Sequence, residues 1–315
     1  MNSVNLFWSN INLNKTHDQW VNSKAVFSPH HALSIYSHSQ KNKVYLITYH
    51  NNTNIQSNNV EIINANTLYS SKDAYQSLLN GNSIAHISDY VRIKKALTNN
   101  GVVLDMDAVS INDFPNVDGF IASLPAKKTS SMAIKFGKTR QPIKVHDKSW
   151  DGEALSSFPT KPSPKSAELF NALLNKIYYY LSKPKDPKID WNFVMYGLQE
   201  ITRRCDDMIA FPPITFGAIP AWKKSGNCYS LESKEIFNGQ TSKFGYVLPS
   251  VEEIMQKASV VQHFYESAFK NTEIQFDSNF WKKLNSNTFL AYEAKHVVGE
   301  NWRSILTDYY HYINE

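Results

Sequence analysis

The 315-residue chain contains only two cysteines, Cys205 and Cys228. Two cysteines without the spacing of metal ligands exclude a disulfide-rich secreted scaffold and the common structural zinc sites. One disulfide between them is an alternative, but reduced thiols of a cytosolic protein are the simpler interpretation.

Long hydrophobic runs are missing as well. No segment approaches the roughly 18 consecutive apolar residues of a membrane span. The segment of residues 1–9 is short and polar, and it contains no hydrophobic region of the kind found in signal peptides. We therefore expect a soluble cytoplasmic protein, with a piece of a membrane-anchored parent as the alternative.

The chain also has no strong charge of one sign. It carries 33 Lys and Arg against 28 Asp and Glu, a formal net charge of +5. This charge is modest for the length, and no basic block or nucleic-acid-binding module is present, so no RNA or DNA partner is expected. The G-x-G-x-x-G and Walker signatures of glycine-rich phosphate loops are absent.

The residues that are abundant fit a soluble globular protein, because 42% are hydrophobic and only 19% are charged. Aromatic residues make up 13% of the chain, including 17 Tyr and 7 Trp. Such rings can stack on sugars or bases, or they can simply fill a core.

The first third of the chain alternates between expected strands and helices. Asn99, Asn100 and Gly101 tolerate left-handed dihedrals, so they end the last of these helices. The alternation predicts an α/β sheet with its ligand site at the carboxyl ends of the strands. Strands are expected at residues 4–8, 32–36, 44–48, 60–63 and 102–105, and helices at 17–27, 73–79 and 84–98.

The rest of the chain is less regular. Strands are expected at residues 120–124 and 132–136, a loop at 158–166, helices at 166–181, 191–204 and 302–313 and from 251 onward, and an irregular pocket wall at 211–222.

A pair of carboxylates follows the buried strand at residues 102–104. Asp105 and Asp107 are separated by one residue, so in an extended segment their side chains point the same way. Buried carboxylates are costly unless a positive group meets them, and Mg²⁺ or Mn²⁺ prefers oxygen ligands. The pair therefore predicts a metal site, whereas a merely solvated strand end is the alternative.

Asp89 and Arg92 lie three residues apart, on one face of the preceding helix. Only the short turn at residues 99–101 separates this helix from the strand that ends in Asp105, so the helix is expected to pack against that strand. An exposed ion pair of small energetic value is the alternative interpretation.

This arrangement resembles the nucleotide-sugar-binding core of the DXD glycosyltransferases with a GT-A fold. The closest group is family 32-like, which includes capsular-polysaccharide and α-glycosyltransferases and is distantly similar to the clostridial toxin glucosyltransferases. Asn100 replaces the first glycine of the family pattern, and Val103 replaces its usual aromatic residue. The matching residues are Ser88, Asp89, Arg92, Leu97, Gly101, Asp105 and Asp107.

The resemblance implies a GT-A-like, Rossmann-like α/β fold, with a mixed sheet flanked by helices and with C-terminal helical additions. Residues 1–125 would form the nucleotide-sugar-binding core that ends in the DXD strand. Residues 126–315 would form the acceptor side and the C-terminal part of the same catalytic domain.

The resemblance also implies roles for the four catalytic candidates Asp89, Arg92, Asp105 and Asp107. Asp105 and Asp107 would hold Mn²⁺ or Mg²⁺ against the donor diphosphate, Asp107 most directly. Asp89 would accept hydrogen bonds from ribose or donor-sugar hydroxyls. Arg92 would steady Asp89 or the sugar.

Three aromatic residues near the N-terminus, Phe7, Trp8 and Tyr36, are candidates to contact the nucleotide base. The resemblance places them on strands that form one wall of the nucleotide pocket. Packing in the core of these strands is the alternative. For acceptor recognition, Trp191, Asn192 and residues 211–222 could offer ring faces to a sugar.

Four residues near the C-terminus could close the donor site from the other side. His263 resembles the histidine that serves as a third metal ligand in related enzymes, and His296 is the alternative. Asn301 and Trp302 could cap the donor phosphate. A histidine that only makes structural hydrogen bonds is the competing interpretation for either position.

The sequence thus predicts a metal-dependent glycosyltransferase, as in polysaccharide biosynthesis. It would move a sugar from a UDP- or GDP-sugar to a glycan or another hydroxyl acceptor, with retention of configuration. No catalytic base is evident, and the resemblance implies that the leaving phosphate accepts the proton. A metal-dependent nucleotidyltransferase, a phosphohydrolase and a non-catalytic carbohydrate-binding protein are the alternatives.

Overall fold

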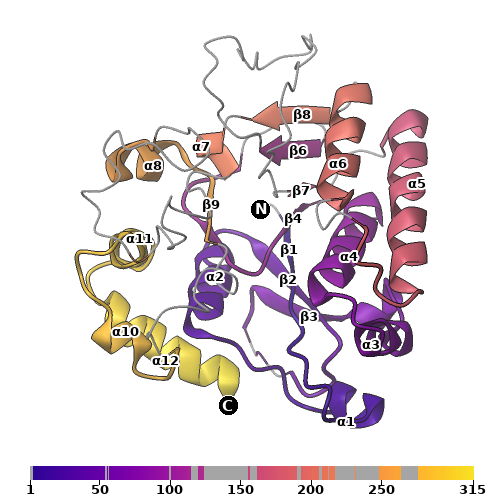
Figure 1. Cartoon of the computed structure of the whole chain (residues 1–315). Helices are drawn as coiled ribbons and strands as arrows, with labels where there is room; N and C mark the ends of the chain where they lie inside the picture. The colour runs from indigo at the N-terminus through magenta and orange to yellow at the C-terminus, as the bar shows by residue number, and fades with distance from the viewer. Residues whose placement is uncertain are drawn as a thin grey trace.

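A parallel sheet with helices on both faces forms the centre of the computed structural model (Figure 1). The structure describes residues 3–53, 55, 57–98, 101–114, 120–123, 155–156, 162–189, 193–205, 208–211, 213–216, 231, 248–263 and 276–315.

The sheet has five strands in the order β3-β2-β1-β4-β7. Its first four strands in the chain run parallel, and β7 pairs antiparallel with β4. The carboxyl ends of β1 and β4 therefore lie side by side, with Leu6 paired to Leu104. The strands are β1 (Ser3–Phe7), β2 (Lys43–Thr48), β3 (Val60–Asn64), β4 (Val102–Leu104) and β7 (Leu155–Ser156).

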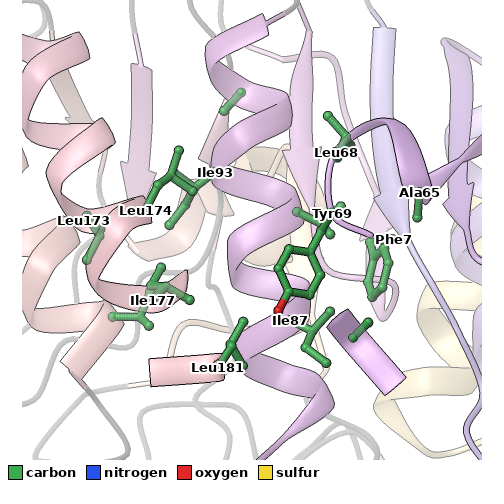
Figure 2. Packing of buried hydrophobic residues seen from close by; sticks show 14 of the residues in the cluster. Phe7, Ala65, Leu68, Tyr69, Ile87, Ile93, Leu173, Leu174, Ile177 and Leu181 are labelled. Carbon is green, nitrogen blue, oxygen red and sulfur yellow. The ribbon is translucent and has the colours of Figure 1, made fainter. Parts of the chain in front are cut away.

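Helices from both halves of the chain cover the two faces of this sheet (Figure 1). One face packs against α3 (Ser71–Leu79) and α4 (Ile84–Thr98), with α5 (Pro164–Leu181) and α6 (Phe193–Arg204) behind α4. The other face packs against α2 (Pro29–Ser39), which α12 (Trp302–Asn314) supports. In Figure 2, Leu174 and Ile177 of α5 lie on one side of α4, and Phe7 of β1 lies on the other.

The alternation of side chains along each strand decides which helices they meet. Val4 and Leu6 of β1 pack on the α2 side, whereas Phe7 packs on the α4 side. In β4, Val103 is on the α4 side. Two residues further along, Asp105 is therefore directed toward α4, and this local geometry prepares the contact with Arg92 described below.

A second hydrophobic core lies between the α2 side and the C-terminal helices. A short antiparallel pair connects it to the segment that follows Asp107, because Ala108 of β5 pairs with Gln262 of β9. The elements are β5 (Ala108–Ser110), α8 (Val251–Lys257), β9 (Val260–Gln262), α10 (Phe280–Lys283) and α11 (Phe289–Val298).

The remaining elements are short. Strands β6 and β8 pair in parallel. The short elements are α1 (His17–Val21), the 3₁₀ turn η1 (Ala65–Thr67), β6 (Phe120–Ser123), β8 (Met208–Phe211) and α7 (Pro213–Phe216). No helix among the described residues has the length and apolar character needed to cross a membrane.

The structure confirms most of the regular elements expected in the first third of the chain, but the strand expected at residues 32–36 is wrong. These residues lie inside α2, which begins at Pro29 after the N-cap Ser28. All but one of its 11 residues are buried. A helix buried on every side has no solvent-exposed face, so its polar and apolar residues do not separate with the 3.6-residue period that marks surface helices.

The helix expected at residues 17–27 is also shorter than predicted, because α1 ends at Val21. Asn22 is its C-cap residue, and the Ser23 hydroxyl donates to the Trp20 carbonyl. A serine side chain that bonds a nearby backbone carbonyl competes with the hydrogen bonds of a helix. The strand expected at 132–136, and residues 217–222 of the expected pocket wall, lie outside the described residues.

Gly101 directly precedes β4 and has a φ of +130°. A Cβ atom at this position would stand 2.6 Å from the backbone oxygen of Ser3. We expect Gly101→Ala to lower the free energy of unfolding by roughly 2–3 kcal/mol, because strain and a backbone clash act together. Urea denaturation followed by circular dichroism measures this change.

Gly299→Ala is the matched control. Gly299 has a φ of +97°, but nothing lies within 4 Å of its added Cβ. Only the backbone cost of roughly 1 kcal/mol is expected there. Equal losses in the two variants would show that the contact with Ser3 is unimportant.

Candidate functional site

Arg92 of α4 joins two of the predicted carboxylates. Its Nη2 lies 2.5 Å from Oδ1 of Asp89, one turn back on the same helix, and its Nη1 lies 2.9 Å from Oδ2 of Asp105. The Arg92 side chain is only 7% exposed, and the two carboxylates are about one-fifth exposed, at 21% and 22%. The guanidinium fork thus connects the helix to the end of β4.

This group combines one guanidinium with the two carboxylates that it contacts. Burial raises the pKa of the Asp89 carboxyl above its usual value, and the charge of Asp105 adds to this shift, while Arg92 opposes it. Asp107 is a third acidic residue, two positions after Asp105. A divalent cation, or a substrate rich in hydroxyl donors, is the kind of partner that this charge favours.

The register of β5 and β9 brings His263 toward the D-x-D segment. Ala108 and Gln262 form the last pair of this antiparallel ladder. Beyond this pair, Asp107 lies in a turn in which the Ala108 N–H donates to the Asp105 carbonyl at 3.2 Å, so the D-x-D segment is not extended. His263, 1% exposed, directly follows β9.

Glu293 of α11 contacts the imidazole ring of His263. Nε2 of His263 lies 2.7 Å from Oε2 and 3.0 Å from Oε1 of Glu293. Both side chains are 0% exposed. Burial raises the pKa of the Glu293 carboxyl above its usual value, and His263 opposes that shift.

Two further buried histidines lie at the N-terminus of α2 and pack beside the residue that follows β1. The ring of His31 lies 4.0 Å from that of Trp8, and the ring of His30 lies 4.2 Å from that of His31. Burial lowers the pKa of His31 to about 3. It also lowers the pKa of His30, to which the charges of His31 and His263 contribute. A row of packed rings therefore runs from the end of β1 toward β9.

The three aromatic candidates near the N-terminus lie in different places. Trp8 directly follows β1, beside the D-x-D segment, and its Nε1 donates to the carbonyl of Val26 at 2.9 Å. Phe7 is 5% exposed and belongs to the α4-side core. Tyr36 lies on α2, edge-on to Tyr309 at 5.3 Å, so the strand on which its expected role depended is not there.

The other three C-terminal candidates lie on or directly beside helices α11 and α12. Trp302 is 4% exposed and packs edge-on against Trp281, within the core of the C-terminal helices. Asn301 caps α12 and is exposed, and His296 is exposed on α11. Of the acceptor candidates, Trp191 and Asn192 lie outside the described residues, as does Cys228.

The two carboxylates of the D-x-D segment are oxygen donors of the kind that Mn²⁺ and Mg²⁺ accept. Within the described part of the chain, no three His, Cys, Asp or Glu side chains are close enough to hold a metal alone. Phosphate oxygens of a substrate would therefore have to supply part of the coordination.

Sequence reasoning missed Glu293 and the pair His30–His31. One signal was present for Glu293, since it is a charged residue in the otherwise apolar run at residues 289–294. Charged residues in such runs are rarely buried without a partner. His30 and His31 follow Ser28 and Pro29, which is a helix start that could have been recognised.

The sequence matches no protein-family model, and no curated protein matches it. Among solved structures, the chain is similar to one described as "PaToxG Glycosyltransferase". The sequence identity is 14%, the match covers 63% of this chain and 69% of that chain, and the TM-score is 0.34. A similarity of this size is too weak to define either the fold or the activity of the chain.

Proposed function

We propose that this protein is a metal-dependent glycosyltransferase that uses a nucleotide-sugar donor, a UDP- or GDP-sugar. The observation that carries the proposal is the contact of Arg92 with both Asp89 and Asp105. It joins the two motifs predicted from the sequence into one anionic group at the carboxyl ends of β1 and β4. In open α/β sheets, ligands bind at this edge.

In this proposal, each side chain of the group has its own task. Asp105 and Asp107 would hold Mn²⁺ or Mg²⁺ together with phosphate oxygens of the donor, Asp107 most directly. When bound, the cation neutralises the charge that develops on the leaving diphosphate. Asp89 accepts hydrogen bonds from hydroxyls of the donor sugar or ribose. Arg92 holds the carboxylates of Asp89 and Asp105 in position by contacting both. Trp8, beside this group, is the aromatic candidate best placed to contact the base.

The acceptor in this proposal is a glycan or another hydroxyl compound, and the transfer retains configuration. The leaving diphosphate would accept the proton of the acceptor hydroxyl. Carboxylates near the reacting carbon also stabilise the positive charge that the sugar acquires as its bond to phosphate breaks. Asp89 is the carboxylate proposed for that role.

Thermal unfolding in the presence of UDP- and GDP-sugars tests the proposal. A ligand that binds only the folded state stabilises it by about 2.7 kcal/mol at 100 times its dissociation constant. We expect one donor to raise the Tm by several degrees with Mn²⁺ present and to have little effect with EDTA.

The same panel separates the alternatives. A shift by free nucleotides with release of phosphate or pyrophosphate, and none by nucleotide sugars, would favour a nucleotidyltransferase or phosphohydrolase. Binding of sugars without metal and without turnover would favour a carbohydrate-binding protein. No response to any nucleotide sugar with Mn²⁺ would rule the proposal out.

A further inference from the structure

A serine, a histidine and an aspartate form a chain of hydrogen bonds between the helices α1 and α3, outside the group around Arg92. Nδ1 of His17 lies 2.9 Å from Oδ1 of Asp18, and Nε2 of the same ring lies 3.0 Å from Oγ of Ser71. The three residues belong to the first turns of the two helices, which lie side by side (Figure 1). A hydroxyl, a base and a carboxylate in this order are typical of nucleophilic catalysis.

The carboxylate decides which ring nitrogen of His17 carries the hydrogen. Ionised Asp18 only accepts hydrogen bonds, so the hydrogen of the neutral ring is on Nδ1 and is donated to Asp18. Nε2 then keeps its lone pair and accepts the hydroxyl hydrogen of Ser71. A hydroxyl that donates to a neutral imidazole can lose its proton to the ring while its oxygen attacks an electrophile.

Two aromatic rings hold the imidazole of His17 in this orientation. It lies edge-on to both, with ring centres 5.8 Å from Tyr75 and 6.3 Å from Trp20. The Tyr75 hydroxyl donates to the Lys15 carbonyl at 2.6 Å. Nε1 of Trp20 donates to the Asn10 carbonyl at 2.9 Å, so both neighbours are themselves fixed. A base held by packed side chains needs little rearrangement in order to accept a proton.

The first turn of α3 supplies a backbone donor directly after Ser71. The N–H of Ser71 itself donates to Oδ1 of Asn66 at 2.7 Å. The N–H of Asp73 donates to Oγ of the N-cap Ser70. Between them, the N–H of Lys72 makes no hydrogen bond to any residue that the structure describes. The N–H after a nucleophilic serine often stabilises the negative oxygen that forms in acyl transfer.

We propose that Ser71 and His17 form a second catalytic site, which hydrolyses small carboxylic esters, with Asp18 as a positioning residue. Oγ of Ser71 bonds to the carbonyl carbon of the ester while its proton passes to Nε2 of His17. The bond from that carbon to the alcohol oxygen then breaks, and the alcohol leaves with this proton. Water next attacks the acyl-serine and gives a proton to Nε2, which returns it to Oγ as the free acid leaves. This inference does not depend on the proposed function.

The exposure of the three residues limits the substrate and the part that Asp18 plays. Ser71 is 6% exposed and the side chain of His17 is 21% exposed, so the hydroxyl lies just beneath the surface. A short acyl group such as acetyl can approach it more easily than a long one. The side chain of Asp18 is 87% exposed, and ionic contacts in water contribute little. The serine and the histidine therefore supply most of the proposed catalysis.

Reaction of the full chain with diisopropyl fluorophosphate, followed by peptide mapping in a mass spectrometer, tests the inference. The reagent phosphorylates serine hydroxyls that a neighbouring base activates and releases fluoride, whereas ordinary serines react far more slowly. We expect the label on Ser71 of the folded protein and not on the heat-denatured chain. His17→Ala should slow the labelling by about 10²-fold or more. Turnover of p-nitrophenyl acetate should fall by a similar factor in His17→Ala and in Ser71→Ala.

Asp18→Asn tests the positioning role. It should slow the labelling of Ser71 by at most about 10-fold, because the carboxylate is exposed. Asp18→Glu keeps the carboxylate and should restore most of the lost rate. A loss of packing alone would not be reversed in this way, and the Tm of every variant is measured alongside.

Ser23→Ala is the matched control. Oγ of Ser23 also contacts a histidine, at 3.2 Å from Nδ1 of His50. Within the described part of the chain, however, no carboxylate contacts that ring. Its two nitrogens face the backbone carbonyl oxygens of Ser23 and Asn10, each at 3.1 Å. The control variant should be labelled on Ser71 at the wild-type rate.

Several results would overturn the inference and reduce the three residues to a contact between two helices. A label on another residue, or one that reaches Ser71 no faster in the folded than in the heat-denatured chain, is the first. Wild-type labelling in a folded His17→Ala variant is the second, and labelling of Ser71 without turnover of the ester is the third. The label is mapped on the wild-type chain, so a variant that fails to fold does not prevent the decision. Neither metal nor nucleotide sugar is added, so the proposed function is tested separately.

Discussion

Asp107→Ala is expected to abolish the Mn²⁺-dependent binding of a nucleotide sugar and to reduce sugar transfer by about 10²–10³-fold or more. Asp107 is the second carboxylate of the D-x-D segment and directly precedes β5. Without it, the cation that neutralises the leaving diphosphate would lose its most direct protein ligand. Calorimetric titration with Mn²⁺ and donor, together with a transfer assay, measures both effects.

Asp113→Ala is the control for this variant, because Asp113 is an exposed aspartate a few residues further along the chain. We expect it to bind donor and metal as the wild type does. Metal-dependent donor binding that survives in Asp107→Ala would place the cation elsewhere and remove the D-x-D segment from the proposed mechanism.

Arg92→Met is expected to cause the second large effect, on stability and on activity together. The variant leaves Asp89 and Asp105, each about one-fifth exposed, without the guanidinium that now lies between them. Breaking one side of a buried ion pair costs about 3–5 kcal/mol, and the partial exposure of both acids favours the low end of that range. Denaturant titration at neutral pH measures the loss.

The stability that Arg92→Met loses relative to wild type should become smaller as the pH falls. Burial already raises the pKa of Asp89 and Arg92 opposes this, so removing Arg92 raises that pKa further. A carboxyl whose pKa is higher in the folded state than in the unfolded state binds more protons when folded, so its penalty shrinks as the pH falls. The difference between Arg92→Met and wild type should therefore be smaller at pH 5 than at pH 7.

Arg204→Met provides the comparison, because Arg204 faces Glu200 in an ion pair that is 54% exposed on both sides. Such pairs contribute about 1 kcal/mol or less. If Arg92→Met were as mild as Arg204→Met, or equally destabilised at both pH values, the contact with the two carboxylates would have little energetic weight.

The pattern of the sequence was sufficient for the strands that carry the site and for α4. The apolar run of β4 is short and continuous, only Asn5 interrupts that of β1, and α4 shows its buried stripe at Ile87 and Val91. These are local periodicities, and each side chain in them is directed by its own backbone. The contact between Asp89 and Arg92 belongs to the same class, since residues three apart on a helix are neighbours.

Helix α2 shows where local patterns fail. Its residues are buried against the sheet on one side and against α12 on the other, so the helix has no solvent-exposed face. The segment at 32–36 consequently has the apolar character of a strand. Only the packing of elements that are distant in the sequence distinguishes the two, and the expected position of Tyr36 on a pocket wall changed with it.

By itself, the sequence determined that two acids end a buried strand and that an acid–arginine pair lies on the helix before it. The tertiary structure alone decided that Arg92 contacts Asp105 as well as Asp89, and that Glu293 contacts His263. The physical reason is the reach of the forces involved. Dihedral preferences and burial patterns act over a few residues, whereas strand register and core packing join segments from opposite ends of the chain.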